Sequence, residues 1–206
     1  MHSDQELNYL TKSLQHHPSP YIIYELDGSI AWANIAANYI FNLKSLDELA
    51  VKNIDEKITN NFGDLDSIAL YYDTPIEISL RDINFFMRTR VHMIPVDISG
   101  GIMLIELLCS SRSGLDALRK TIDCIEHHRI ELAYQKQLNL ESGKVTGIEA
   151  LLRLKDGEGG YLQNDKIIPQ IEGESVFSLV VLESLVQLEK FFNVKDEIGF
   201  KDATVY

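Results

Sequence analysis

Cysteine is scarce in this 206-residue sequence, which contains only Cys109 and Cys124. The two are not arranged as a CxxC pair. Disulfide-dependent secreted domains carry several cysteines, and structural zinc sites carry close Cys or His pairs. Neither class is therefore expected, and reduced thiols indicate a cytoplasmic protein.

Long apolar runs are also missing. No stretch approaches the roughly 18 apolar residues that a membrane-spanning helix needs. The polar opening MHSDQELNYLTKSLQHH lacks the apolar core of a signal peptide. The sequence predicts a soluble protein that has no membrane partner.

Basic residues are few. The sequence has 19 basic and 31 acidic residues, which give a net charge of -12. Nucleic acids and anionic membranes attract basic surfaces, so neither is expected as a partner. What is abundant is hydrophobic residues, at 45%, which suffices for packed cores in one large domain or two small ones.

Hydrophobic patterning in the first half predicts an α+β unit. Leu7, Leu10 and Leu14 recur at helical spacing before two prolines, which indicates a short leading helix. The dipeptide Asp27-Gly28 suits a tight hairpin turn between two apolar strands. Residues 34–66 are expected to be helical and loop-like, with no strand. Five strands are expected in total, at residues 21–26, 29–33, 76–80, 85–95 and 102–108.

A further helix is expected at residues 115–125, where apolar side chains follow the 3-4-3 spacing of a coiled-coil seam. Pairing with a second chain and packing on its own domain both fit this short pattern, so both readings stay open. Beyond it we expect strands at 131–140 and 144–154, a helix at 176–192, and a third strand starting near Glu197.

The segment HPSPYIIYELDGSIAWAN at residues 17–34 resembles the opening of a PAS domain, and the three later strands complete that family's order. The resemblance implies a five-stranded antiparallel sheet with flanking helices. It also implies an enclosed space for haem, flavin, a small metabolite or no ligand. Residues 34–56 contain no cysteine, so flavin photochemistry is not expected. His16, His17 and His92 are candidate haem ligands, although surface or structural roles are favoured for all three.

A second resemblance rests on three ordered motifs, namely YQKQ at 134–137, GIEALLR at 147–153 and IIPQIE at 167–172. Together they are similar to the start of an EAL domain, whose landmarks are Y-Q-P-I, G-x-E-A-L-x-R and F-I-P-x-A-E. Active members of that family are modified TIM barrels that cleave cyclic di-GMP with Mg²⁺ or Mn²⁺. The resemblance makes Glu149 the metal-ligand position and makes Gln135 and Arg153 the dinucleotide-binding positions.

Catalysis is nevertheless not expected from this sequence. A barrel of eight strand–helix units needs about 250 residues, whereas residues 129–206 provide three strands at most. One carboxylate cannot hold a two-metal site. Lys136 stands where the family has proline and Ser175 where it commonly has glycine, and both departures change the pocket that the resemblance implies.

We therefore expect a PAS sensory domain at residues 1–112, a linker helix at 113–128 and a partial, TIM-barrel-like EAL domain at 129–206. The predicted function is non-enzymatic signalling in or near cyclic di-GMP signalling. A homodimer is expected through the PAS domain and linker helix, and a second protein partner at the EAL remnant. Two alternatives stay open, namely a fragment of a PAS-regulated phosphodiesterase and a unit that binds cyclic di-GMP without cleaving it.

Overall fold

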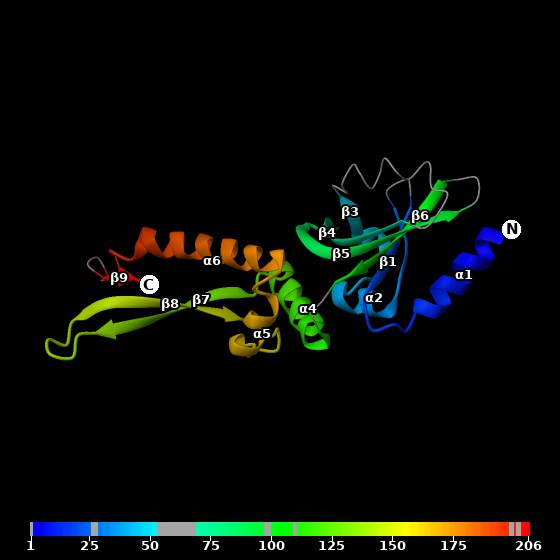
Figure 1. Cartoon of the computed structure of the whole chain (residues 1–206). Coiled ribbons are helices and arrows are strands. Elements are labelled where there is room, and N and C mark those ends of the chain that lie inside the picture. The colour runs from blue at the N-terminus through cyan, green and yellow to red at the C-terminus, as the bar shows by residue number, and fades with distance from the viewer. Residues whose placement is uncertain are drawn as a thin grey trace. The chain divides into compact units, whose positions relative to one another are not determined.

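The computed structural model describes residues 2–25, 29–52, 69–96, 100–108, 111–197, 200 and 203–206 (Figure 1). The chain forms two compact units, Met1–Arg119 and Lys120–Tyr206. Their boundary falls inside helix α4 (Arg112–Glu126), which confirms the helix expected at 115–125. The Asp27-Gly28 turn, Cys109 and residues 53–66 lie outside the described residues.

The first unit is an α+β fold built on one antiparallel sheet with the strand order β2-β1-β6-β5-β4-β3. The two edge strands, β2 and β3, approach each other. The strands are β1 (Tyr21–Tyr24), β2 (Ile30–Ala33), β3 (Leu49–Lys52), β4 (Ala69–Leu80), β5 (Ile83–Val96) and β6 (Gly100–Leu107).

The expectation of five strands was wrong, because the sheet has six. Strand β3 lies in the stretch for which no strand was predicted, and it pairs Leu49 with Leu80 and Val51 with Ile78. No turn signal such as Asp27-Gly28 flanks this strand, and the acidic pair before it, Asp47-Glu48, favoured a helix. That acidic pair lies in a short 3₁₀ turn, η1 (Leu46–Glu48), whose first residues are capped by Ser45.

Strand β4 also begins earlier than expected, before Pro75 rather than after it. Proline cannot donate a ladder hydrogen bond and is confined to positions where none is needed. Pro75 pairs with Arg88 of β5, while β3 pairs only with residues 77–80 on the other side of β4. Pro75 therefore lies on a stretch of β4 where no partner from β3 requires its missing N–H.

Helices cover both faces of this sheet. Helix α1 (His2–Leu14) packs the leucines at 7, 10 and 14 against Tyr21, Ile23 and Leu104. Helix α2 (Ile35–Phe41) buries Phe41, whose ring centroid lies 6.4 Å from that of Phe85. Since successive strand residues face opposite sides, the alternation along β5 supplies the core on the second face.

Asn34 joins these parts at the start of α2 and is fully buried. Its Oδ1 atom accepts hydrogen bonds from the backbone N–H groups of Tyr21 and Ala37, both at 3.0 Å. Its Nδ2 atom donates to the carbonyls of Leu14 and Ser19 at 3.1 and 2.9 Å. One side chain thus caps α2 and fixes the end of α1 and the loop before β1.

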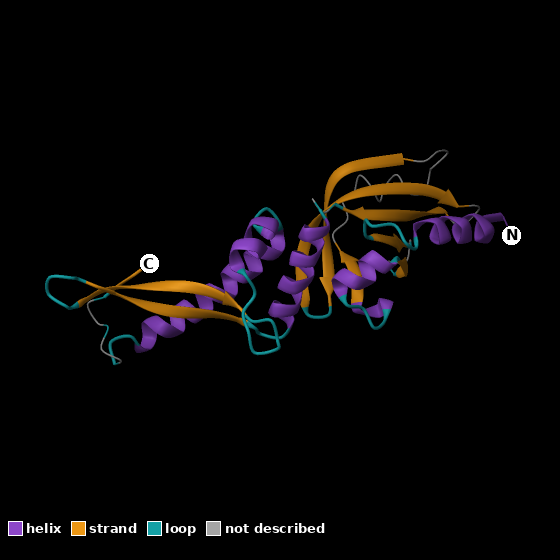
Figure 2. Cartoon of the chain, turned by 90° about the horizontal axis from the view of Figure 1, so that it is seen from below, coloured by secondary structure: helices purple, strands orange, loops and turns teal. Residues whose placement is uncertain are grey.

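The second unit holds a three-stranded mixed sheet with the order β7-β8-β9 (Figure 2). Strands β7 (Ile130–Leu138) and β8 (Val145–Leu154) form an antiparallel hairpin, as the sequence predicted. Strand β9 (Thr204–Val205) runs parallel to β8 and begins later than the predicted third strand. Helix α6 (Ser175–Val194) confirms the helix expected at 176–192 and runs beside the hairpin (Figure 1).

Helix α5 (Asn164–Ile171) was not predicted. It is short and contains Pro169, which disfavours a helix interior because proline lacks an N–H and clashes with the preceding turn. The Nδ2 atom of Asn164 donates to the carbonyl of Leu152 at 2.7 Å and ties the helix start to β8. Within the described residues, no helix is both long and apolar enough to cross a membrane.

Candidate functional site

Gln135 and Glu149 lie directly opposite each other in the β7–β8 hairpin. Directly paired residues of antiparallel strands project their side chains to the same face, with Cβ atoms about 5 Å apart. Gln135 is exposed and Glu149 is half-buried. The structure therefore brings together two of the three positions that the sequence motifs single out.

Arg153 lies on the same face as Glu149 but four residues further along β8. At a rise of about 3.3 Å per residue, their Cα atoms are about 13 Å apart. The Nη1 atom of Arg153 donates to the carbonyl of Leu152 at 2.9 Å. Gln135, Glu149 and Arg153 thus form an elongated polar strip along one face of the hairpin, with Arg153 at one end, rather than a compact cluster around Glu149.

Helix α6 packs against the face of the hairpin opposite the polar strip. The face opposite Glu149 carries Tyr134, whose ring stacks on Phe191 of α6 with centroids 4.1 Å apart. Gln187 of α6 binds the outer edge of β7, where its Oε1 atom accepts from Leu132 N–H at 3.0 Å and its Nε2 atom donates to the Ile130 carbonyl. Alternation along both strands then turns the polar residues away from α6.

Tyr206 closes one end of the polar strip, and sequence reasoning missed it. Its backbone pairs with β8 through Tyr206 N–H to the Ile148 carbonyl and Ala150 N–H to the Tyr206 carbonyl, both at 2.9 Å. A Cβ atom on Gly147 would lie 2.8 Å from the Tyr206 ring and from Oε1 of Gln137. The glycine of the GIEALLR motif therefore leaves room for this aromatic ring.

A second polar group lies at the other end of the strip, around Glu131. The Oε1 atom of Glu131 accepts from the Tyr161 hydroxyl at 2.7 Å, and Lys155 Nζ lies 2.5 Å from Oε2. The hydrogen bond from Lys155, followed by that from Tyr161, lowers the pKa of Glu131 below its usual value. No sequence motif pointed to these residues, which become neighbours through the hairpin register and through the β-bridge between Lys155 and Tyr161.

The polar strip supplies few ligands for a divalent cation. Mg²⁺ prefers octahedral oxygen coordination, and the paired residues offer one carboxylate and one amide oxygen. Among the described residues, no group of three His, Cys, Asp or Glu side chains is placed to hold a metal ion. The described residues alone therefore do not fit a two-metal centre.

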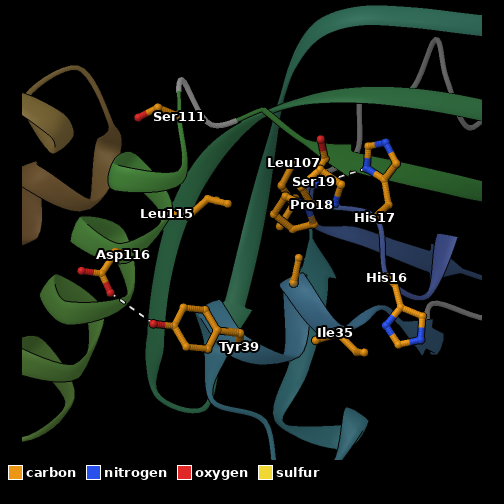
Figure 3. Close-up of a pocket in the computed structure, with 12 residues that line it drawn as sticks. His16, His17, Pro18, Ser19, Ile35, Tyr39, Leu107, Ser111, Leu115 and Asp116 are labelled. Carbon is orange, nitrogen blue, oxygen red and sulfur yellow. Dashed lines mark hydrogen bonds between the residues drawn. The ribbon is translucent and has the colours of Figure 1, made fainter.

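The first unit contains a cavity of about 690 Å³ (Figure 3). Its walls come from the loop at residues 16–20, the first turns of α2, the end of β6 and the start of α4. Tyr39 of α2 donates its hydroxyl hydrogen to Oδ1 of Asp116 in α4 at 3.2 Å. The guanidinium of Arg119 lies 4.7 Å from the centroid of the Tyr39 ring.

His16 and His17 both line this cavity and are exposed. The Nδ1 atom of His17 accepts a hydrogen bond from Ser19 N–H at 3.1 Å. In a neutral imidazole the proton is then on Nε2. A haem-ligating nitrogen must be unprotonated, so this hydrogen bond opposes the haem role considered for His17.

His92 lies away from the cavity, on strand β5 opposite Leu104. Its Nε2 atom is buried and makes no hydrogen bond to the described residues. Burial lowers the pKa of His92 below 6.5, the nearby Glu106 carboxylate opposes this shift, and Arg90 adds to it. His92 is therefore a half-buried histidine of the sheet.

Comparisons with known proteins give little for either unit. No family model matches the chain, and no curated protein matches it. Among solved structures, it is similar to one described as "Crystal Structure of the E.coli DhaR(N)-DhaL complex", with 11% sequence identity and a TM-score of 0.38. That match covers 52% of this chain and 36% of the other, and at this TM-score it supports no conclusion.

Proposed function

We propose that this protein is a non-enzymatic signalling protein. Its first unit is a PAS-type sensor, α4 is the connecting helix, and its second unit is an EAL-type remnant that binds another protein. Cytoplasmic localisation belongs to this proposal. The observation that carries it is a second apolar face on α6, opposite the face that packs on the hairpin.

The order of elements supports the PAS assignment. Two paired strands are followed by α2, which starts at Asn34, and then by β4, β5 and β6 in the same antiparallel sheet. This succession agrees with the family order that the residue 17–34 motif implies. Strand β3 is an addition at one edge of that sheet.

The second unit supports an EAL-type assignment in two ways. The motif residues Gln135 and Glu149 face each other across the hairpin. Strands β8 and β9 run parallel, and α5 and α6 form the connection between them. Parallel strands joined by a helix are the repeating unit of a TIM barrel.

Helix α6 supports a protein-binding role for this unit. Val180 and Phe191 are buried beside the hairpin, while Leu182 and Leu185 on the other side are 57% and 54% exposed. A surface helix of a globular protein normally has one apolar stripe, and a helix that is apolar all round is normally covered. A partner protein with an apolar surface of its own would bury this second stripe.

The strongest alternative is that the chain is part of a PAS-regulated cyclic di-GMP phosphodiesterase. The facing pair of Gln135 and Glu149 favours it, because both occupy the family's ligand positions. Turnover of cyclic di-GMP separates the two ideas, since our proposal expects none.

Binding of cyclic di-GMP without hydrolysis is a third reading, and calorimetric titration tests it. Our proposal expects no heat of binding at micromolar protein with or without Mg²⁺. A titratable heat that Arg153→Ala abolishes would favour ligand binding. Leu151→Ala is the control for loss of fold, because Leu151 lies on β8 two residues before Arg153 and so on the same face.

Light scattering on the whole chain tests the partner part of the proposal. We expect a dimer formed by the first unit and α4, so Leu182→Glu on α6 should leave the mass unchanged. A monomer would rule out the homodimer. A dimer that Leu182→Glu dissociates would place a second copy of the chain on α6 instead.

A further inference from the structure

We infer that the cavity of the first unit binds an uncharged, largely apolar organic molecule and that this ligand acts on α4. The inference rests on the proposed sensory role and gives that role a site. The cavity is bounded by residues 16–20, by α2, and by the segment that leaves β6 and enters α4. Among its lining residues, Leu107 of β6 also belongs to the buried core.

The size of the cavity suits a small molecule. Ligand pockets usually measure about 300–1,000 Å³ and are lined mainly by apolar side chains with a few polar groups. The volume of about 690 Å³ falls within this range. Its apolar walls are Pro18, Pro20, Ile35, Ala36, Leu107 and Leu115.

Two large side chains on this wall are about half exposed. Ile35 is 48% exposed and Tyr39 is 51% exposed. Each lies on α2 and faces the cavity (Figure 3). A bound apolar molecule would remove both from water, at a gain of about 25 cal/mol for each Å² of apolar surface covered.

The polar groups of the lining narrow the ligand class. Among the described residues that form the wall, none is lysine or arginine, and Asp116 is a carboxylate. Phosphate-bearing ligands are usually held by lysine or arginine side chains. In His17, Nδ1 already accepts the Ser19 N–H. An uncharged molecule fits this set.

Binding at this site would act directly on α4. Leu115 and Asp116 of α4 line the cavity, and Asp116 is held by the Tyr39 hydroxyl. Arg119, one turn on, lies over the ring of the same tyrosine. A ligand that contacts Tyr39 therefore touches the residue that attaches the first turns of α4 to α2. Helix α4 continues without a break from the first unit into the second.

The test uses N-phenyl-1-naphthylamine, a neutral aromatic probe whose fluorescence rises in apolar surroundings. With the full chain we expect saturable binding. Ile35→Glu should weaken it tenfold or more, since the new carboxylate would lose water inside the site. Ile35 is the first residue of α2, and an acidic side chain there favours the helix. The variant should therefore remain folded, which Trp32 fluorescence verifies.

The matched control is Leu182→Glu, the same kind of change at an equally exposed position on α6. We expect it to leave probe affinity unchanged. If Leu182→Glu abolishes binding while Ile35→Glu preserves it, the probe binds α6 and the inference fails. Absence of saturable binding to the unaltered chain overturns it as well.

Amide hydrogen exchange measures whether probe binding stabilises α4. The probe should slow amide exchange in residues 112–119 of the unaltered chain and have no such effect in Ile35→Glu. Binding with unchanged exchange in α4 would overturn the coupling. These readouts do not depend on cyclic di-GMP, so turnover of that dinucleotide would refute the proposed function and leave the cavity site standing.

Discussion

The Oδ1 atom of Asn34 accepts the backbone N–H of Tyr21 at 3.0 Å, so one buried side chain fixes the first residue of β1. The same oxygen caps α2, and the amide nitrogen holds the carbonyls that end α1 and precede β1. This arrangement also shapes one wall of the cavity, because residues 16–20 run between α1 and β1.

Replacing Asn34 should therefore destabilise the first unit strongly. Asn34→Ala leaves the N–H groups of Tyr21 and Ala37 without their acceptor. Each buried N–H group that lacks an acceptor costs about 1–3 kcal/mol of unfolding free energy. We expect a loss of about 3 kcal/mol in unfolding free energy. Urea titration followed by the fluorescence of Trp32, the only tryptophan, measures it. Asn8→Ala, on the exposed side of α1, is the control and should change stability by less than about 0.5 kcal/mol.

Gln187 offers a parallel test in the second unit. Gln187→Ala removes the side chain that pairs with the edge of β7, leaving Leu132 N–H and the Ile130 carbonyl unsatisfied. We expect a loss of about 1–2 kcal/mol and faster exchange of the Leu132 amide. Asn193→Ala, on the exposed side of α6, should do neither. Unchanged exchange at Leu132 in Gln187→Ala would show that the edge is protected by something else.

His92 should make the first unit less stable in mild acid. Burial lowers its pKa in the folded state below 6.5, so the unfolded chain takes up the proton first. Stability from this group is therefore present above pH 6.5 and decreases as the pH falls from 6.5 towards the folded pKa. Urea midpoints at pH 7.5 and 5.5 should differ less in His92→Gln than in the unaltered chain. Equal differences would exclude His92 as the cause.

The thiol of Cys124 should react slowly with disulfide reagents. Burial raises its pKa to about 11, with the Asp123 carboxylate adding to the shift, and its Sγ atom donates to the Lys155 carbonyl at 3.3 Å. At pH 8 only about a thousandth of such a thiol is ionised, and the thiolate is the reactive form. In a Cys109→Ser variant, disulfide exchange with DTNB should be at least about 100-fold slower than in urea. Comparable rates would mean that Cys124 is accessible.

Local patterning predicted most of the strands and helices, because their signals lie within single segments. The alternation through Met87, Val91 and Met93 is enough to indicate a strand with one buried face. Strand β3 escaped prediction because it lacks a flanking turn signal such as the Asp27-Gly28 pair between β1 and β2, and α5 because Pro169 argues against a helix. Their presence depends on tertiary pairing, which no local window contains.

For the candidate sites too, the sequence indicates single residues, whereas their arrangement depends on tertiary pairing. The motifs brought Gln135, Glu149 and Arg153 to attention, but only the hairpin register shows that the first two face each other while Arg153 lies about 13 Å further along. Tyr206 and Gln187 could not be predicted, since each acts on strand residues more than fifty positions earlier in the chain. The cavity was likewise invisible, because its walls come from four separate segments.

The most direct test of the central claim is ³¹P NMR of cyclic di-GMP incubated with the full chain and Mg²⁺ or Mn²⁺. The proposed non-enzymatic role predicts that the cyclic diester signal persists unchanged with either metal, as in a protein-free sample. Conversion to the linear dinucleotide that Glu149→Gln abolishes would contradict the account and identify the chain as a phosphodiesterase.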